Sequence, residues 1–560
     1  MAKKIKYNKV QPIDSIRDMM LQAVAAMGDD ILFKYKKDGK VCDVSCKDFY
    51  NETLYIGNAL AKRGYVEGHH LACTGNNSYR WIVSYLSTLC GGNVFVPIDK
   101  DLPTKDMFNI VNHSESCVIF CDKSYVKTLV DGKDEIPTIK LIVCMDGECD
   151  GAVSFDTLLE EGKKLTEEGY TAYMDNITAD NELKLLVYTS GTTGNPKGVM
   201  LSHHNLRSAI YYGLMVETVN TRCLSVLPYH HTYEAVIGIL VSIHKHNCIC
   251  INESLRAVLS NLNLYKPVYI FVVPAFAELF YKRVNAALEE KGKAGLVRKM
   301  IKLSNGLRKI GIDLRRKFFK QIIDNFGGEL RQIVCGGAPV RAEVAEFFTN
   351  IGIDLEIGYG ITECSPLVSV NQASDNDYNS VGATLPCLQV KIDGSDENGN
   401  GEICVKGDVV MMGYFKDEEQ SAEVLVDGWF HTGDLGNYTN EKLYITGRKK
   451  NLIVLDNGKN IYPEEIENYI YGIPYVKDAV VYSIKDEKGV EVDLCCEAFL
   501  DKDNMPDGGK NAEAVFKADV SAAVKDLPQY KHIAKVVLRD EEFPKTTTKK
   551  IKRREVINNQ

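Results

Sequence analysis

One loop constrains the fold of this chain more than any other stretch. Residues 188–198 read Tyr-Thr-Ser-Gly-Thr-Thr-Gly-Asn-Pro-Lys-Gly, and the apolar run at 183–187 predicts a buried strand directly before them. A long helical pattern opens at Ser202. We therefore expect a loop between a strand and a helix, where glycines permit unusual backbone angles and backbone N–H groups point at an anion. Three hydroxyls and one ammonium of the loop are suited to phosphate: Ser190, Thr192, Thr193 and Lys197.

The spacing within this loop excludes two common phosphate-binding loops. The nucleotide-triphosphatase loop needs Gly, four residues, then Gly-Lys-Ser/Thr, but five residues after Gly191 stands Pro196. The dinucleotide pattern Gly-x-Gly-x-x-Gly is also absent here. The stretch instead resembles, nearly letter for letter, the signature loop of AMP-forming adenylating enzymes, which include acyl-CoA synthetases, luciferases and the adenylation domains of peptide synthetases. The alternative interpretation is a polar surface turn.

Composition narrows the class of protein. At 560 residues the chain is too long for one core and suggests about three or four folding units. A net charge of −9 argues against general nucleic-acid binding. The 17 cysteines are scattered through apolar runs, which favours free thiols in a reducing compartment. Because the N-terminus lacks a signal pattern and no apolar run reaches membrane-spanning length, we expect a cytoplasmic protein.

The pattern along the chain indicates an α/β fold. Residues 1–180 alternate helical and strand patterns, which favours a parallel sheet with helices on both faces. Short strands with turn signals begin at 381, and residues 448–560 are long enough for an α+β domain. With the resemblance, we expect an N-terminal adenylation domain at 1–447 and a mobile lid domain at 448–560. The first would contain two α/β sheet subdomains and a small β-barrel-like subdomain.

Two glycine-rich turns follow apolar strands, at 336–339 and at 358–363. Ligands of open α/β sheets collect at the carboxyl ends of strands, and Tyr359 offers a ring face for a base. Thr362 can donate to a phosphate oxygen, and Glu363 offers the hard oxygen that suits Mg²⁺. In the family that the chain resembles, these turns bind adenine, the α-phosphate and the metal.

Further matches follow in family order. The resemblance places Asp434 on the ribose hydroxyls together with Arg448, makes Lys450 the hinge, and puts Gly458 on the CoA side. Near the end, the stretch 544–551 resembles the family's closing motif and makes Lys550 the catalytic lysine. The family's usual glycine is Lys549 here, so a role shared by the two lysines stays open.

The predicted site is therefore large. The catalytic set is Lys550, Glu363, Thr362 and His231, with His230 as the alternative beside the acyl carboxylate, and 231–240 is expected to line the acyl pocket. The nucleotide-binding set is Thr189, Ser190, Gly191, Thr192, Thr193, Gly194 and Lys197 in the loop, Gly336, Gly337, Ala338 and Pro339 in the first turn, Gly358, Tyr359 and Gly360 in the second, and Asp434 and Arg448.

The resemblance implies a two-step reaction that uses ATP, Mg²⁺ and coenzyme A. It is strongest to bacterial long-chain fatty-acid CoA ligases, so a fatty acid is the expected substrate. An acyl-AMP or acyl-carrier-protein ligase, and a nucleotide-binding protein without turnover, remain alternatives. Chain length and a homodimer stay open.

One charged segment stands apart from these motifs. Residues 291–320 hold eleven Lys or Arg against one acid, Asp313, with apolar residues near helical spacing. Such a stretch can lie on the inner face of an anionic membrane, and the alternative is a solvated helix packed on its own domain.

Overall fold

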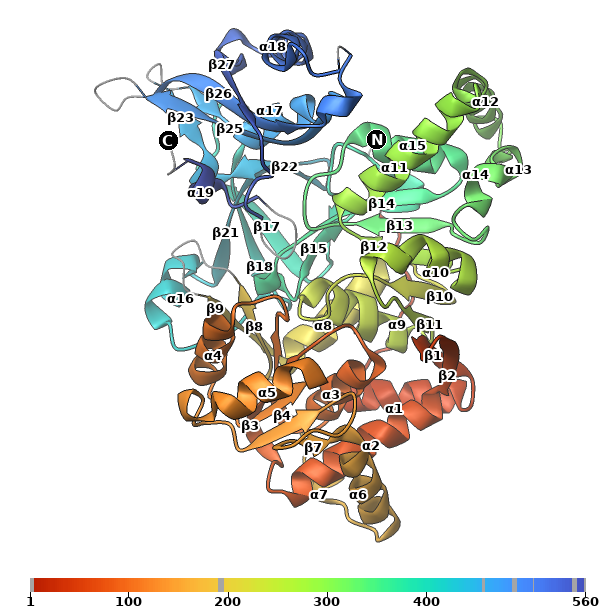
Figure 1. The fold of residues 1–560 in the computed structure, drawn as a ribbon, viewed down its shortest axis with the longest axis vertical. Coiled ribbons are helices and arrows are strands. Elements are labelled where there is room, and N and C mark those ends of the chain that lie inside the picture. Colours follow the sequence, from red (N-terminus) through yellow and green to blue (C-terminus); the bar gives the residue numbers. More distant parts are fainter. Residues whose placement is uncertain are drawn as a thin grey trace. The chain divides into compact units, whose positions relative to one another are not determined.

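The computed structural model describes residues 5–189, 196–455, 459–485, 491–506, 508–545 and 551–557 (Figure 1). The chain divides into two compact units. The first comprises Met1–Gln389 and Val405–Phe430, and the second comprises Val390–Cys404 and His431–Gln560. The predicted mixed α/β class, with a larger N-terminal and a smaller C-terminal part, is confirmed.

The first unit contains a mostly parallel sheet that carries the glycine-rich turns. Its strand order is β16-β15-β14-β13-β12-β10-β11-β1-β2, with β2, β15 and β16 antiparallel to their neighbours. All four residues of β12 are buried, because helices cover both faces and the strand needs no polar side. The bounds are β1 (Ile31–Lys37), β2 (Lys40–Ser45), β10 (Arg222–Ser225), β11 (Cys248–Ile251), β12 (Tyr269–Val272), β13 (Gln332–Cys335), β14 (Asp354–Gly360), β15 (Leu367–Val370) and β16 (Ala383–Thr384).

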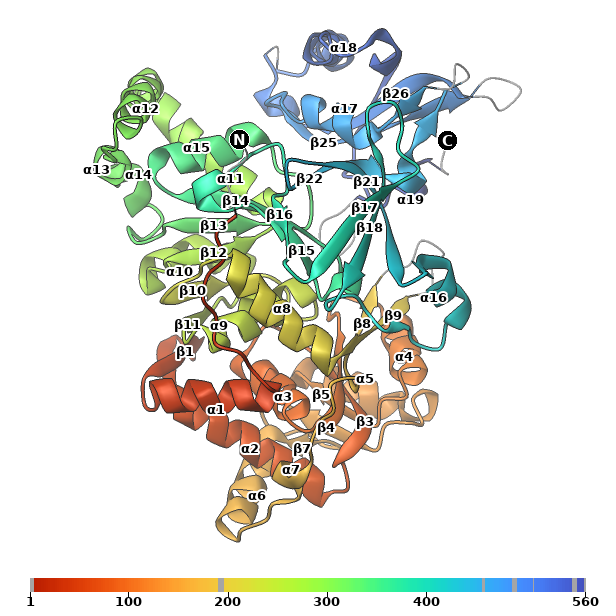
Figure 2. The same ribbon diagram turned by 180° about the vertical axis from the view of Figure 1, so that it is seen from behind.

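Helices flank this sheet. Figure 1 shows α11 beside α15, which contacts β14, and Figure 2 shows α8, which contacts β15, from the other side. The bounds are α8 (His203–Val216), the π-helix η2 (Tyr233–Leu240), α9 (Val241–His244), α10 (Val258–Tyr265), α11 (Pro274–Glu290), α12 (Ala294–Arg308), α13 (Arg315–Phe318), α14 (Lys320–Asp324) and α15 (Ala342–Ile351). The charged segment 291–320 is thus not one continuous helix.

The second sheet of the first unit carries the phosphate loop. Its strand order is β19-β9-β8-β4-β3-β5-β6-β7, and β3 to β7 run parallel. The bounds are β3 (Glu67–Thr74), β4 (Gly92–Ile98), β5 (Val118–Cys121), β6 (Leu141–Cys144), β7 (Val153–Ser154), β8 (Leu183–Thr189), β9 (Lys197–Ser202) and β19 (Gly413–Tyr414). The associated helices are α1 (Ile16–Met27), α2 (Cys46–Lys62), α3 (Tyr79–Leu89), α4 (Thr104–His113), α5 (Lys123–Asp131), α6 (Phe155–Glu167) and α7 (Ala172–Asp175).

The loop differs from the prediction in one element. A strand, β9, lies between the loop and the helix, antiparallel to β8. The prediction of a direct strand–loop–helix connection is therefore wrong. Val199 and Leu201, two positions apart, are both fully buried, as expected for side chains on one face of a strand. Helix α8 begins only after Ser202, whose side chain accepts from the Asn205 N–H while Asn205 Oδ1 accepts from the Ser202 N–H, a capping box.

The second unit is richer in strands. One sheet holds β17 (Leu388–Asp393), β18 (Gly401–Gly407), β21 (Trp429–Thr439) and β22 (Lys442–Arg448), and another holds β25 (Val476–Lys485), β26 (Glu491–Leu500) and β27 (Lys535–Arg539). Strand β25 alternates between two cores. Val481 packs with residues of α17 (Pro463–Ile470) and α18 (Ala512–Ala523), whereas Val480 and Tyr482 pack with Phe543 and Val556.

Candidate functional site

The two strands that flank the phosphate loop meet at Thr189 and Lys197, which are paired across β8 and β9. Five predicted loop residues lie outside the described residues: Ser190, Gly191, Thr192, Thr193 and Gly194. The Lys197 ammonium lies 5.0 Å from the ring centroid of Tyr414, on the adjacent strand β19. A cation over an aromatic face is attracted by the ring quadrupole, so Tyr414 orients this lysine.

Glu363 lies at the other end of the same tyrosine. The Tyr414 hydroxyl donates to Glu363 Oε1 at 3.0 Å, and the backbone N–H of Met411 donates to the Glu363 carbonyl at 2.9 Å. Burial, and then the Glu363 charge, raise the pKa of Tyr414, so the hydroxyl stays protonated and keeps donating. The structure thus brings Lys197 and Glu363, 166 positions apart in the sequence, to one tyrosine that sequence reasoning missed.

The two glycine-rich turns lie against each other at the carboxyl ends of β13 and β14. A Cβ on Gly336 would lie 3.3 Å from the Gly358 carbonyl oxygen, and a Cβ on Gly360 would lie 2.2 Å from the Pro366 oxygen. The second distance is far below any real contact, so only glycine fits at 360. Gly337, Ala338 and Pro339 are exposed beside them. Strands β13 and β14 are paired in parallel, so their carboxyl ends lie at the same edge of the sheet.

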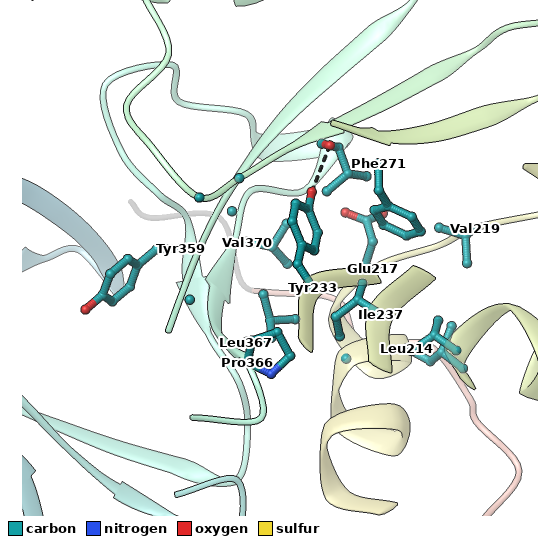
Figure 3. Close-up of a pocket in the computed structure, with 17 residues that line it drawn as sticks. Leu214, Glu217, Val219, Tyr233, Ile237, Phe271, Tyr359, Pro366, Leu367 and Val370 are labelled. Atoms are coloured by element: carbon teal, nitrogen blue, oxygen red, sulfur yellow. Dashed lines mark hydrogen bonds between the residues drawn. The ribbon is translucent and has the colours of Figure 1, made fainter. Parts of the chain in front are cut away.

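An apolar pocket begins at these turns and extends between α8, η2 and β12–β14 (Figure 3). The Tyr359 ring points away from the apolar side chains, whereas Tyr233 and Phe271 face each other with ring centroids 5.9 Å apart. The Tyr233 hydroxyl donates to the Val334 carbonyl at 3.0 Å. The principal apolar residues that line the pocket are Leu214, Tyr233, Ile237, Phe271, Val334 and Leu367. Such a pocket suits a hydrocarbon group.

The predicted lining at 231–240 is represented by Tyr233 and Ile237, and neither His231 nor Gly238 is among the lining residues. The rings of His230 and His231 are tilted by 46°, with their centroids 4.3 Å apart, and His230 Nε2 lies 3.5 Å from Asp99 Oδ2. Burial lowers the pKa of His230. The role of His231 stays a prediction.

In the second unit, β21 and β22 bring two predicted residues into direct contact. Asp434 and Arg448 are paired in register, and Arg448 Nε forms an ion pair with Asp434 Oδ1. Within β21, the Asp434 backbone N–H donates to the Thr432 hydroxyl at 3.1 Å. Asp434 is almost fully buried, so its carboxylate orientation is set by the strands.

Lys450 follows Arg448 in a short 3₁₀ turn, η6 (Lys449–Asn451). Burial, then the charges of Arg448 and Arg554, lower the pKa of Lys450. Three further predicted positions, Gly458, Lys549 and Lys550, lie outside the described residues.

The first unit therefore has the features of a nucleotide-binding α/β protein: paired flanks of a phosphate loop, two adjoining glycine-rich turns at strand ends, and an apolar pocket beside them. A family model described as AMP-binding enzyme matches residues 21–415, and one described as AMP-binding enzyme C-terminal domain matches residues 465–550. This chain belongs to the AMP-binding enzyme family.

Several relatives and solved structures are similar over most of the chain. Long-chain-fatty-acid--CoA ligase FadD15 of Mycobacterium bovis is 28% identical, with 87% of this chain and 83% of that protein covered. Long-chain-fatty-acid--CoA ligase 1 of Cavia porcellus is 30% identical, with 87% and 72% covered. The structure of the anthranilate CoA ligase AuaEII in complex with anthranoyl-AMP has a TM-score of 0.78 at 17% identity over 98% of each chain, a likeness of fold alone.

The sequence also predicted free thiols and no membrane-spanning segment. All 17 cysteines lie in the described ranges, and the structure shows each of them as a free cysteine. No helix in the described part of the chain combines the length and apolar character needed to cross a membrane.

Proposed function

We propose that this enzyme activates a fatty acid with ATP to acyl-AMP and pyrophosphate, and then transfers the acyl group to coenzyme A. The observation that carries the proposal is the apolar pocket, which begins at the two glycine-rich turns and is lined by Leu214, Tyr233 and Phe271. A hydrocarbon chain gains free energy from leaving water there, while its carboxylate stays at the turns. The names of the relatives support the same substrate class.

In the first half-reaction the carboxylate attacks the α-phosphate of ATP, so two anions must approach. Lys197 beside the loop would neutralise the departing phosphates, and Asp434 with Arg448 would hold the ribose. Glu363 would hold Mg²⁺, since a carboxylate oxygen fits a cation held mainly by phosphates and water, and Thr362 would donate to a phosphate oxygen. When bound, Mg²⁺ would lower the repulsion between the reacting anions.

In the second half-reaction the CoA thiol attacks the acyl-AMP carbonyl and AMP leaves. We propose that residues 448–560 act as the lid, with Lys450 as the hinge. Its two faces would present Lys550 for the first step and Gly458 for the second, because a lysine needed for adenylation obstructs the incoming thiol.

A panel of carboxylates from acetate to oleate, assayed for AMP formation with and without CoA, tests the proposal. We expect CoA-dependent AMP formation with fatty acids and acyl-CoA as the product. Acyl-AMP accumulation that CoA does not affect would favour a ligase for a carrier protein. Absence of pyrophosphate release with every acid would instead identify a binding protein without turnover.

We also propose contact between α12 and the cytoplasmic face of an anionic membrane. Leu296 and Leu303 are 56% and 58% exposed on α12, and the nearby Ile310 is 71% exposed. Buried Val297 and Ser304 show that another face of the helix packs on its own unit, so the exposed leucines form a separate apolar face. Lysines and arginines around them suit anionic lipid.

Liposome sedimentation with the double variant Leu296→Ser/Leu303→Ser tests this contact. Arg315 and Arg316 are poor probes, because their guanidinium groups donate to backbone carbonyls such as those of Thr349 and Leu330. We expect severalfold less sedimentation with anionic vesicles, whereas Leu264→Ser, an exposed leucine on α10, is the control. Equal sedimentation of all variants would contradict membrane contact. Light scattering of the wild-type protein without vesicles tests the homodimer.

A further inference from the structure

Three adjacent strands of the second unit bring four metal-binding side chains together. Glu402 and Cys404 lie two positions apart on β18, so they share one face of that strand. Strand β18 lies between β17 and β21 (Figure 1), which contribute Asp393 and His431. One ligand atom from each of the four residues lies within 4.8 Å of the other three. Within the ranges that the structure describes, no second group of three or more such side chains is this compact.

Hydrogen bonds around the cluster hold its central carboxylate in one orientation. The Thr432 hydroxyl donates to the Ile403 carbonyl at 2.7 Å, which fixes β21 against β18 at this point. The Gly433 N–H donates to Glu402 Oε1 at 3.1 Å, and the Lys449 ammonium donates to Glu402 Oε2 at 2.7 Å. Each carboxylate oxygen has two lone pairs, so these bonds leave acceptor positions for a further partner. Outer partners of this kind orient the ligands of metal sites.

One ring nitrogen faces two different ligand atoms. His431 Nδ1 lies 3.3 Å from Cys404 Sγ and 3.2 Å from Glu402 Oε2. A ring nitrogen carries either a proton or a lone pair, so His431 Nδ1 either donates to the carboxylate or accepts from the thiol, and it cannot do both. A metal ion placed among the three atoms would bond to the sulfur, the nitrogen and the oxygen together.

The set of ligand atoms selects the metal. Sulfur and imidazole nitrogen suit Zn²⁺, whereas Mg²⁺ and Ca²⁺ prefer oxygen. In a tetrahedral zinc site with bonds of about 2.0–2.3 Å, the ligand atoms lie about 3.3–3.8 Å apart. The two distances from His431 Nδ1 already lie close to this range, and the exposed side chain of Asp393 has room to move inward. Two carboxylates and a thiolate carry three negative charges, and Zn²⁺ with the Lys449 ammonium carries three positive ones.

We infer that these four side chains form a Zn²⁺ site in the second unit, with one sulfur, one nitrogen and two carboxylate ligands. The site goes beyond the proposed fatty-acid reaction, and neither half-reaction depends on it. Burial raises the pKa of the Cys404 thiol to about 11, so the thiol holds its proton until the metal displaces that proton to water. The alternative is a network of hydrogen bonds and ion pairs without a metal.

The first measurement uses the unmodified full-length protein, reduced and freed of metal with a chelator. Co²⁺ serves as a coloured substitute for Zn²⁺, and excess Mg²⁺ competes for sites that have oxygen ligands only. We expect one equivalent of Co²⁺ to give the charge-transfer absorption of a thiolate ligand, and one equivalent of Zn²⁺ to abolish it. Cobalt binding without a thiolate band, or no retention of Zn²⁺ against a chromophoric chelator, would overturn the inference. Activation of fatty acids is assayed separately, and its failure would refute the proposed function alone.

The second measurement locates the metal with variants. Cys404→Ser should lose the thiolate band, and both Cys404→Ser and His431→Gln should bind Zn²⁺ about 100-fold more weakly or worse, because loss of a mere orienting partner already costs 10- to 100-fold. Cys149→Ser is the matched control, since its Sγ lies 2.9 Å from Cys144 Sγ in another thiol-containing part of the chain. Its band and affinity should equal those of the wild type. Loss of the band in Cys149→Ser, or its retention in Cys404→Ser, would overturn the inference.

Discussion

At the scale of single residues, Tyr414 connects two charged groups of opposite sign. Its hydroxyl donates to Glu363, and its ring lies under the Lys197 ammonium. Because Tyr414 contacts both groups, we expect it to position them. The hydrogen bond orients the Glu363 carboxylate, and a fixed orientation is what a ligand of a hard cation requires.

We therefore predict that Tyr414→Phe raises the Mg²⁺ concentration needed for half-maximal adenylation by about 10- to 100-fold, as the loss of such an orienting partner commonly does. The measurement is pyrophosphate release with a fatty acid at a series of Mg²⁺ concentrations. Tyr438→Phe, a partly exposed tyrosine on β21, is the control. A variant with lower activity but an unchanged Mg²⁺ dependence would show that Tyr414 does not act through Glu363.

Glu234 provides a test of electrostatics in the interior. It is 1% exposed on η2, and the Ser225 hydroxyl donates to its Oε1. Burial raises the pKa of Glu234 to about 8, above that of the unfolded chain, so the folded state holds this proton more tightly. The contribution of this proton to the free energy of unfolding is complete at pH values below the pKa of Glu234 in the unfolded chain. It is lost as the pH rises towards the pKa of Glu234 in the folded state, by up to about 1.4 kcal/mol per pH unit.

We predict that Glu234→Gln, which mimics the neutral carboxyl, flattens this dependence. The free energy of unfolding is measured by urea denaturation between about pH 5 and about pH 8. The difference between wild type and variant should move in favour of the variant as pH rises. Because other buried acids are the same in both proteins, they cancel. A difference independent of pH would contradict the assigned protonation of Glu234.

At the scale of elements, the capping box of α8 connects the phosphate loop to the pocket. Ser202 ends β9 and begins α8, and Leu214 in the last turn of this helix lines the pocket. We predict that Ser202→Ala lowers the free energy of unfolding by about 1 kcal/mol, the usual cost of a lost N-cap. Ser124→Ala, on the exposed side of α5, should change it by less than about 0.5 kcal/mol. Equal effects of the two substitutions in denaturant titrations would contradict the cap's role.

Some elements could be predicted from the sequence and others could not. The turns at 336–339 and 358–363 directly follow apolar strands. Their position at strand ends could therefore be predicted from residues that are adjacent in the sequence. Strand β9 was missed because its six residues, Lys197–Ser202, adjoin a loop whose composition dominates the pattern. The apolar runs around Leu214, Tyr233 and Phe271 indicate burial, but periodicity does not tell a pocket wall from a core.

Glu217, the C-cap residue of α8, which accepts a hydrogen bond from Gln332 on β13, illustrates the same limit for a polar residue. As a glutamate at the end of a helical pattern it reads as solvated. Only the assembly of α8, β13 and β14 brings Gln332 and Glu356 to it and closes it from water. Tyr414 was missed for a related reason, since its partners Lys197 and Glu363 come from distant parts of the chain. Signals of this kind become visible only with tertiary structure.

At the scale of the whole molecule, the proposed reaction demands two different environments at one carbonyl. Adenylation needs a positive charge beside the α-phosphate, and thioester formation needs room for a thiol. We predict that Lys550→Ala lowers adenylation on the order of 10²–10³-fold, the usual cost of one well-placed charge, yet still converts supplied acyl-AMP and CoA to acyl-CoA. Lys549→Ala should retain both half-reactions if Lys550 alone supplies the positive charge for adenylation.

The hinge is the second part of this argument. Lys450 lies in the short turn after β22, and a proline there fixes φ and removes one backbone donor. We predict that Lys450→Pro holds one orientation of the lid and therefore preserves one half-reaction while the other falls. The two reactions are measured separately, as pyrophosphate release from ATP and as acyl-CoA formation from acyl-AMP. If Lys450→Pro and Lys550→Ala each reduced both half-reactions equally, a rotating lid would have to be abandoned, and a single fixed site would have to perform both steps.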